Sequence, residues 1–253
     1  MEFPKLVFID RQDNFISILK DASTNISSEN PFNIDFMIAD IQHVNEQDCI
    51  YVSPANSFGF MDGGIDLVYS CKMFPKVETN IKRMISRIGL DFEGRDYLPI
   101  GCTLAVPTEF KPNQYMICAP TMLMPQNVKY TKNAYYAMYA ILRLVHKLVS
   151  SAKLNIKKVY IPGLGTGIGG MSANDFSNQV IAAINDFLRD MSNNYSESPN
   201  DISSSMAIDI HLQPYIFIRE NYYDDIIMKQ SNYLIEHRRM QAALEVVAGL
   251  GRR

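Results

Sequence analysis

The sequence of 253 residues has few of the side chains that bind metals or cross-link a fold. It holds four cysteines and four histidines. The histidines show no metal-ligand spacing, and no two cysteines form a C-x-x-C pair. We therefore expect no metal site, no cofactor, and reduced cysteines that mainly belong to the core of a cytoplasmic protein. The cysteines are Cys49, Cys71, Cys102 and Cys118.

The chain also lacks a basic excess and long apolar runs. With 24 Lys and Arg against 27 Asp and Glu, its net charge is -3, which argues against general nucleic-acid binding. No apolar run approaches the roughly 20 residues of a membrane span, and the start shows no signal-peptide pattern. A hydrophobic content of 47% is ordinary for a soluble globular protein, so we expect no membrane contact. The oligomeric state stays open.

Strand-like and helix-like segments alternate along the chain. Alternation of this kind predicts an α/β fold, a three-layer α/β/α sandwich whose central sheet is mixed and largely parallel. Helices are expected to start at caps provided by Asp13 and Thr131. We predict strands over residues 5–10, 36–41, 49–52, 102–106, 115–119, 159–161 and 208–217. We predict one helix that starts at residue 13, one that includes residues 67–69, and four more over residues 75–88, 131–151, 173–191 and 223–248. A polar stretch over 192–205 is expected to be a loop.

One domain is expected over residues 1–253. It divides into a strand-helix extension over 1–35, a core over 36–220 and a helical appendage over 221–253. Two glycine-containing stretches of the core each follow a strand and precede a helix. The first reads S-P-A-N-S-F-G-F-M-D-G-G-I-D from Ser53, and the second reads I-P-G-L-G-T-G-I-G-G from Ile161. Such loops hold anionic ligands at the carboxyl ends of strands in α/β proteins.

These two stretches, together with the A-D-I of residues 39–41, resemble the ligand-binding motifs of macro domains, which bind ADP-ribose. The resemblance spans residues 36–217 in the expected order. The S-P-A-N-S start and the A-P-T-M-x-x-P after Cys118 are most similar to fungal ADP-ribose-1″-phosphatase-like proteins. The resemblance implies ADP-ribose or ADP-ribosylated molecules as partners.

The resemblance also implies roles for individual residues. Asp40, beside Ile41, would accept the exocyclic amine of adenine, unless it only caps a turn. Asn56 would hydrogen-bond the distal ribose, unless it only forms an Asx-turn. Asp66 would position or deprotonate a water at the anomeric carbon, unless it is only a helix-start acid. The diphosphate would lie against Gly63, Gly64 and Ile65 and under Gly165, Thr166, Gly167, Ile168 and Gly169.

Three residues depart from the pattern of the hydrolytic members. Ser53 replaces an asparagine, Asp62 replaces a glycine and is expected to face solvent, and Gly169 replaces an aromatic residue that covers the distal ribose. The departures favour binding over efficient hydrolysis. Three functions therefore stay open: a hydrolase acting at the distal ribose, a non-catalytic reader of ADP-ribosylated partners, and an α/β protein for another nucleotide such as ATP or NAD.

Overall fold

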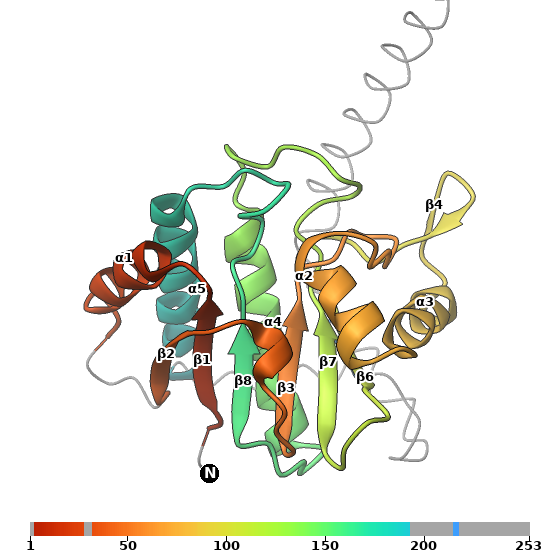
Figure 1. Cartoon of the computed structure of the whole chain (residues 1–253), viewed down its shortest axis with the longest axis horizontal. Helices are drawn as coiled ribbons and strands as arrows, with labels where there is room; N and C mark the ends of the chain where they lie inside the picture. The colour runs from red at the N-terminus through yellow and green to blue at the C-terminus, as the bar shows by residue number, and fades with distance from the viewer. Residues whose placement is uncertain (1–2, 28–31, 193–214, 218–253) are drawn as a thin grey trace, which may run out of the picture. The chain divides into compact units, whose positions relative to one another are not determined.

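The computed structural model describes residues 3–27, 32–192 and 215–217, and its centre is a seven-stranded sheet (Figure 1). The strand order is β2-β1-β8-β3-β7-β6-β9. Neighbours from β2 to β7 run parallel, whereas β6 is antiparallel to both β7 and β9. The strands are β1 (Lys5–Asp10), β2 (Ile34–Ile38), β3 (Cys49–Ser53), β6 (Thr103–Pro107), β7 (Gln114–Cys118), β8 (Lys158–Ile161) and β9 (Tyr215–Phe217).

The central strands are apolar on both faces, as parallel strands covered by helices must be. All five residues of β3 are buried, and β3 pairs with β8 on one side and β7 on the other. Its polar last residue, Ser53, lies in register with Cys118 at the end of β7. The edge of the sheet where these strands end is therefore fixed by buried pairing.

Helices cover both faces of the sheet, which confirms the predicted three-layer architecture. On one face α1 (Asp13–Ser23), α4 (Asn133–Ser150) and α5 (Ala173–Ser192) share a continuous core with the strands. The other face carries η1 (Ile41–His43), α2 (Gly64–Leu67), the π-helical η2 (Val68–Met73) and α3 (Val77–Ile88) (Figure 1). There the aromatic rings of Tyr51, Tyr69, Phe74 and Tyr160 pack together. No described helix is long and apolar enough to cross a membrane.

Two predicted helix caps are wrong in detail. Asp13 is the first residue of α1 rather than its cap, and Gln12 stands at the cap position without a side-chain hydrogen bond. Lys132 rather than Thr131 precedes α4, although the Thr131 hydroxyl accepts a 3.3 Å hydrogen bond from the Asn133 amide. Both polar side chains lie one residue from the expected position.

The second predicted strand also differs, since β2 ends at Ile38 and Ile41 begins the short η1 turn. The carboxylate of Asp40 accepts the Gln42 amide, which starts the turn and ends the extended chain. A two-stranded ribbon, β4 (Asp91–Phe92) with β5 (Arg95–Asp96), was not predicted. The predicted polar loop beyond Ser192, the strand at 208–212 and the helix at 223–248 lie outside the described residues.

Candidate functional site

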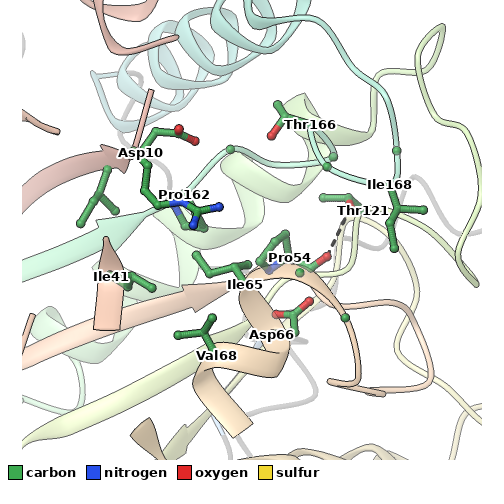
Figure 2. A pocket seen from close by; sticks show the side chains of 18 of the residues that line it. Asp10, Ile41, Pro54, Ile65, Asp66, Val68, Thr121, Pro162, Thr166 and Ile168 are labelled. Carbon is green, nitrogen blue, oxygen red and sulfur yellow. Dashed lines mark hydrogen bonds between the residues drawn. The ribbon is translucent and has the colours of Figure 1, made fainter. Parts of the chain in front are cut away.

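A cavity of about 540 Å³ opens at the carboxyl ends of β1, β3 and β8. Its size falls in the range typical of small-molecule sites. Figure 2 shows side chains from several loops converging on it. The structure brings together here all the residues to which the sequence assigned a binding or catalytic role: Asp40, Ile41, Asn56, Gly63, Gly64, Ile65, Asp66, Gly165, Thr166, Gly167, Ile168 and Gly169.

The first loop, residues 54–64, is organised by the side chain of Asn56. Its amide oxygen accepts hydrogen bonds from the backbone of Phe58 at 3.1 Å and Phe60 at 3.3 Å. Its amide nitrogen donates to the Phe60 carbonyl at 3.1 Å. Asn56 thus forms the Asx-turn that was its alternative role. Of its polar hydrogens and lone pairs, chiefly the second amide hydrogen is left to meet a ligand.

Thr121 and Met122, which follow β7, hold the first loop in place through hydrogen bonds. The Ser57 amide donates to the Met122 carbonyl at 2.9 Å, and the Thr121 hydroxyl donates to the Pro54 carbonyl at 3.4 Å (Figure 2). Both Thr121 and Met122 line the cavity. They belong to the A-P-T-M-x-x-P stretch, which was noted in the sequence only as a sign of resemblance.

The second loop, residues 162–171, leaves a row of backbone amides without partners. The carbonyls of Gly165, Gly167 and Gly169 accept hydrogen bonds from Met171, Gly170 and Val128. Within the described part of the chain, however, the amides from Gly165 to Gly169 donate to no protein group. Gly165 has a φ of 76°, a left-handed backbone that favours glycine. Successive unpaired amides of this kind form an anion-binding nest.

Gly169 is buried, which corrects the interpretation made of it from the sequence. A Cβ atom there would lie 2.4 Å from the Gly165 carbonyl oxygen and 2.6 Å from Val128. Glycine is therefore required by the close approach of the loop to itself, and an aromatic residue at this position could not cover a sugar. The side chain that projects is Ile168, which is 65% exposed. Its Cδ1 atom lies 3.8 Å from the position of a Cβ on Gly63, across the cavity.

Asp40 lies at the end of the cavity next to β1. Its two carboxylate oxygens accept from the backbone amide and the side-chain amide of Gln42, each at 3.1 Å. The Arg11 guanidinium lies 3.8 Å away. Asp40 thus caps the η1 turn, which was its alternative role, and it also lines the cavity. Asp10 and Arg11 were missed as lining residues, although the end of a predicted strand at Asp10 was a usable signal.

Asp66 lies on the floor of the cavity, in α2 (Figure 2). Its Oδ1 atom accepts a 2.6 Å hydrogen bond from the hydroxyl of Ser53, which is fully buried. Burial raises the pKa of Asp66 to about 7, the Ser53 hydrogen bond opposes that rise, and the nearby charge of Asp62 adds to it. A carboxyl group with a pKa near neutrality can exchange protons with a substrate or a water.

The remaining charges leave the cavity acidic. Asp62 is exposed, as expected, yet it lines the cavity together with Asp10, Asp40 and Asp66. Arg11 is the one basic residue among the described lining residues. Among the residues that the structure describes, no cluster of His, Cys, Asp and Glu could hold a metal ion.

Comparison with known proteins identifies the surroundings of this cavity. A model of the macro domain family matches residues 52–180, from β3 into α5, and so includes both loops, Ser53 and Asp66. No protein with a curated description matches the chain.

Proposed function

Since the chain belongs to the macro domain family, whose members bind ADP-ribose, we propose that it hydrolyses an ADP-ribosyl adduct in this cavity. The motifs around Ser53 and after Cys118 support a place near the fungal ADP-ribose-1″-phosphatase-like proteins. The observation that carries the proposal is one cavity that joins an anion nest to a carboxyl group with a raised pKa.

The proposed bound state follows from the chemistry of each wall. The unpaired amides from Gly165 to Gly169 hold the diphosphate without a lysine or arginine. Asp40 accepts the adenine amine with an oxygen that already accepts from Gln42, since a carboxylate has about four lone-pair sites. The distal ribose then lies between Asn56 and Asp66, and Ile168 covers it from the second loop.

The proposed reaction is displacement at the anomeric carbon of the distal ribose. A water oxygen forms a bond to C1″ while the bond from C1″ to the leaving oxygen breaks, and its electron pair stays with that oxygen. Asp66 in its ionised form takes the proton that the water loses, and the leaving group takes up a proton afterwards. A positioned base of this kind contributes ~10²–10⁴-fold in rate.

A non-catalytic reader is the second candidate, and Asn56 favours it. Three of its four hydrogen-bonding capacities serve the first loop, so little of its amide is left to orient a sugar. A reader needs the diphosphate and adenine contacts and no base.

Two measurements on the same samples separate the candidates. Calorimetry should show ADP-ribose binding at micromolar affinity, about -8 kcal/mol, with weaker binding of ADP, ATP and NAD. Single-turnover release of the leaving group should be at least a hundredfold slower in Asp66→Ala, with ADP-ribose affinity much less affected. Binding without turnover by wild type would make the protein a reader. Folded protein without ADP-ribose binding would refute the proposal.

A further inference from the structure

Asp62 stands at a rigid point of the first loop. The residue before it, Met61, is fully buried, and its carbonyl accepts a 2.9 Å hydrogen bond from Ser70. The residue after it is Gly63, whose carbonyl accepts from the Leu67 amide at 3.2 Å. With both neighbours held, the backbone of Asp62 is fixed at the edge of the cavity, which this exposed residue lines.

The carboxylate of Asp62 has no compensating charge. In the described part of the chain it forms no ion pair and no hydrogen bond. The charge of Asp62 contributes to the raised pKa of Asp66, so the two carboxyl groups interact electrostatically. Arg11, the one basic residue among the described lining residues, follows β1 and pairs with Asp40. Strand β8 lies between β1 and β3, the strand that leads into the first loop. Among the described lining residues, the carboxyl groups of Asp62 and Asp66 therefore have no basic residue beside them.

We propose that Asp62 determines the specificity of this site by rejecting ADP-ribosyl adducts whose leaving group is anionic. The substrates are then adducts joined to C1″ through an oxygen whose leaving group is neutral while bound, such as an ester. This inference rests on the proposed function, and it disfavours a 1″-phosphate, which resemblance alone would suggest.

The physical reason is repulsion between like charges at short range. A phosphate monoester carries about -1.5 to -2 charges near neutrality. On C1″ it would lie beside Asp66, whose partial burial reduces the screening by water, and within the field of Asp62, which is exposed. An ester on the 1″ oxygen reacts with the same balance of bonds. Water supplies the new oxygen on C1″, and the bond from C1″ to the ester oxygen breaks to release the carboxylate. Its bound ground state has no charge to repel.

The test compares three ligands with the full chain: ADP-ribose, ADP-ribose-1″-phosphate and ADP-ribose acetylated on the 1″ oxygen of the distal ribose. Calorimetry should show wild type binding the 1″-phosphate at least tenfold more weakly than ADP-ribose. The variant Asp62→Asn should close most of that gap, because loss of this charge favours the 1″-phosphate more than it favours ADP-ribose. A tenfold change corresponds to ~1.4 kcal/mol. Phosphate assayed after each titration confirms that the ligand stayed intact.

Turnover provides the second reading. The ratio of kcat/KM for the acetyl ester over the 1″-phosphate should fall at least tenfold in Asp62→Asn. The matched control is Asp21→Asn, which removes one exposed carboxylate from α1, outside the cavity, and should leave the ratio unchanged.

Three results would overturn the inference. Equal affinity of wild type for ADP-ribose and its 1″-phosphate would show that no charge selection exists. A preference that survives in Asp62→Asn would show that another group causes it. Failure of wild type to bind ADP-ribose would remove the proposed function, and the inference with it, whereas the first two results leave the proposed function standing.

Discussion

The buried hydroxyl of Ser53 donates a 2.6 Å hydrogen bond to Oδ1 of Asp66. Ser53 was read from the sequence as a departure that weakens hydrolysis. In the structure it is the last residue of β3, so the sheet itself holds the donor in place. The bond orients the carboxylate and favours its ionised form, which is the form a base requires.

Replacing Ser53 with alanine should therefore shift the pH dependence of turnover. Loss of the hydrogen bond removes what opposes the raised pKa of Asp66, so that pKa should move above about 7. Because the base must be ionised, the limb on which the rate rises with pH should move upward by about one unit or less. Single-turnover rates measured across that limb would show the variant slow near pH 6.5 and closer to wild type near pH 9.

Ser57→Ala is the control for Ser53→Ala. Ser57 is also fully buried, but its hydroxyl donates to the Met122 carbonyl at 3.2 Å rather than to Asp66. It should cost stability without moving the midpoint of the limb. Identical midpoints in wild type, Ser53→Ala and Ser57→Ala would contradict the role of Ser53.

Replacing Asp66 with asparagine should stabilise the fold at high pH. The pKa of Asp66 rises from the ordinary value of 3.8 to about 7 in the folded protein. The folded chain thus holds a proton that the unfolded chain loses between these values, and stability from this group is lost as pH rises from about 4 to about 7. Near pH 8 the variant should exceed wild type by on the order of 1–3 kcal/mol, reduced from the full shift because Asp66 is partly accessible to solvent.

Urea unfolding of wild type and Asp66→Asn at about pH 4, 6 and 8 measures this difference. The advantage of the variant should disappear near pH 4, where both side chains are neutral. A difference that does not change with pH would mean that the carboxyl group is not perturbed in the folded state.

The sheet and the two loops could be predicted because their signals are local. The run Cys49–Val52 is apolar without interruption, which predicts a strand covered on both faces, and the glycines that follow mark a tight connection. Such features need no knowledge of what lies across the fold. Element type was accordingly predicted better than element ends, as at β2 and α1.

The chemistry of the cavity depends on contacts between distant parts of the chain, and these could not be predicted. Ser53 and Asp66 are 13 positions apart in the sequence. Arg11 follows β1, and its guanidinium lies 3.8 Å from the carboxylate of Asp40, which follows β2. The need for glycine at 169 arises from the approach of Gly165 and Val128, which depends on how the loop folds back. A motif reports which residue types are present, whereas packing decides which of them face the ligand.

Asp40 offers a prediction that separates capping from recognition. Asp40→Ala should weaken ADP-ribose binding by ~1.5–3 kcal/mol, the range for a hydrogen bond to a charged group. It should also reduce the preference for ADP-ribose over its inosine analogue, whose base lacks the exocyclic amine. Gln42→Ala is the matched control, because it removes the side-chain partner of Asp40 at 3.1 Å and keeps the carboxylate. Calorimetry with both ligands would reassign Asp40 as a turn cap if its variant kept the full preference.

The second loop offers a prediction in which position decides the outcome. At Gly167 a Cβ atom would meet nothing within 4 Å, so Gly167→Ala should fold normally and bind ADP-ribose with little loss. Gly167→Glu adds bulk and a negative charge beside the unpaired amides, and it should abolish detectable binding without unfolding the protein.

Two residues further along the chain, Gly169→Ala should already lose binding, because its Cβ would lie 2.4 Å from the Gly165 carbonyl oxygen and distort the nest. Gly169→Phe should lose it as well, instead of tightening it by covering the sugar. Calorimetry with ADP-ribose, beside thermal unfolding of all four variants, measures both effects. Normal binding by Gly167→Glu would show that the second loop is not the phosphate site, and normal binding by Gly169→Ala would show that the loop is not held in the conformation described.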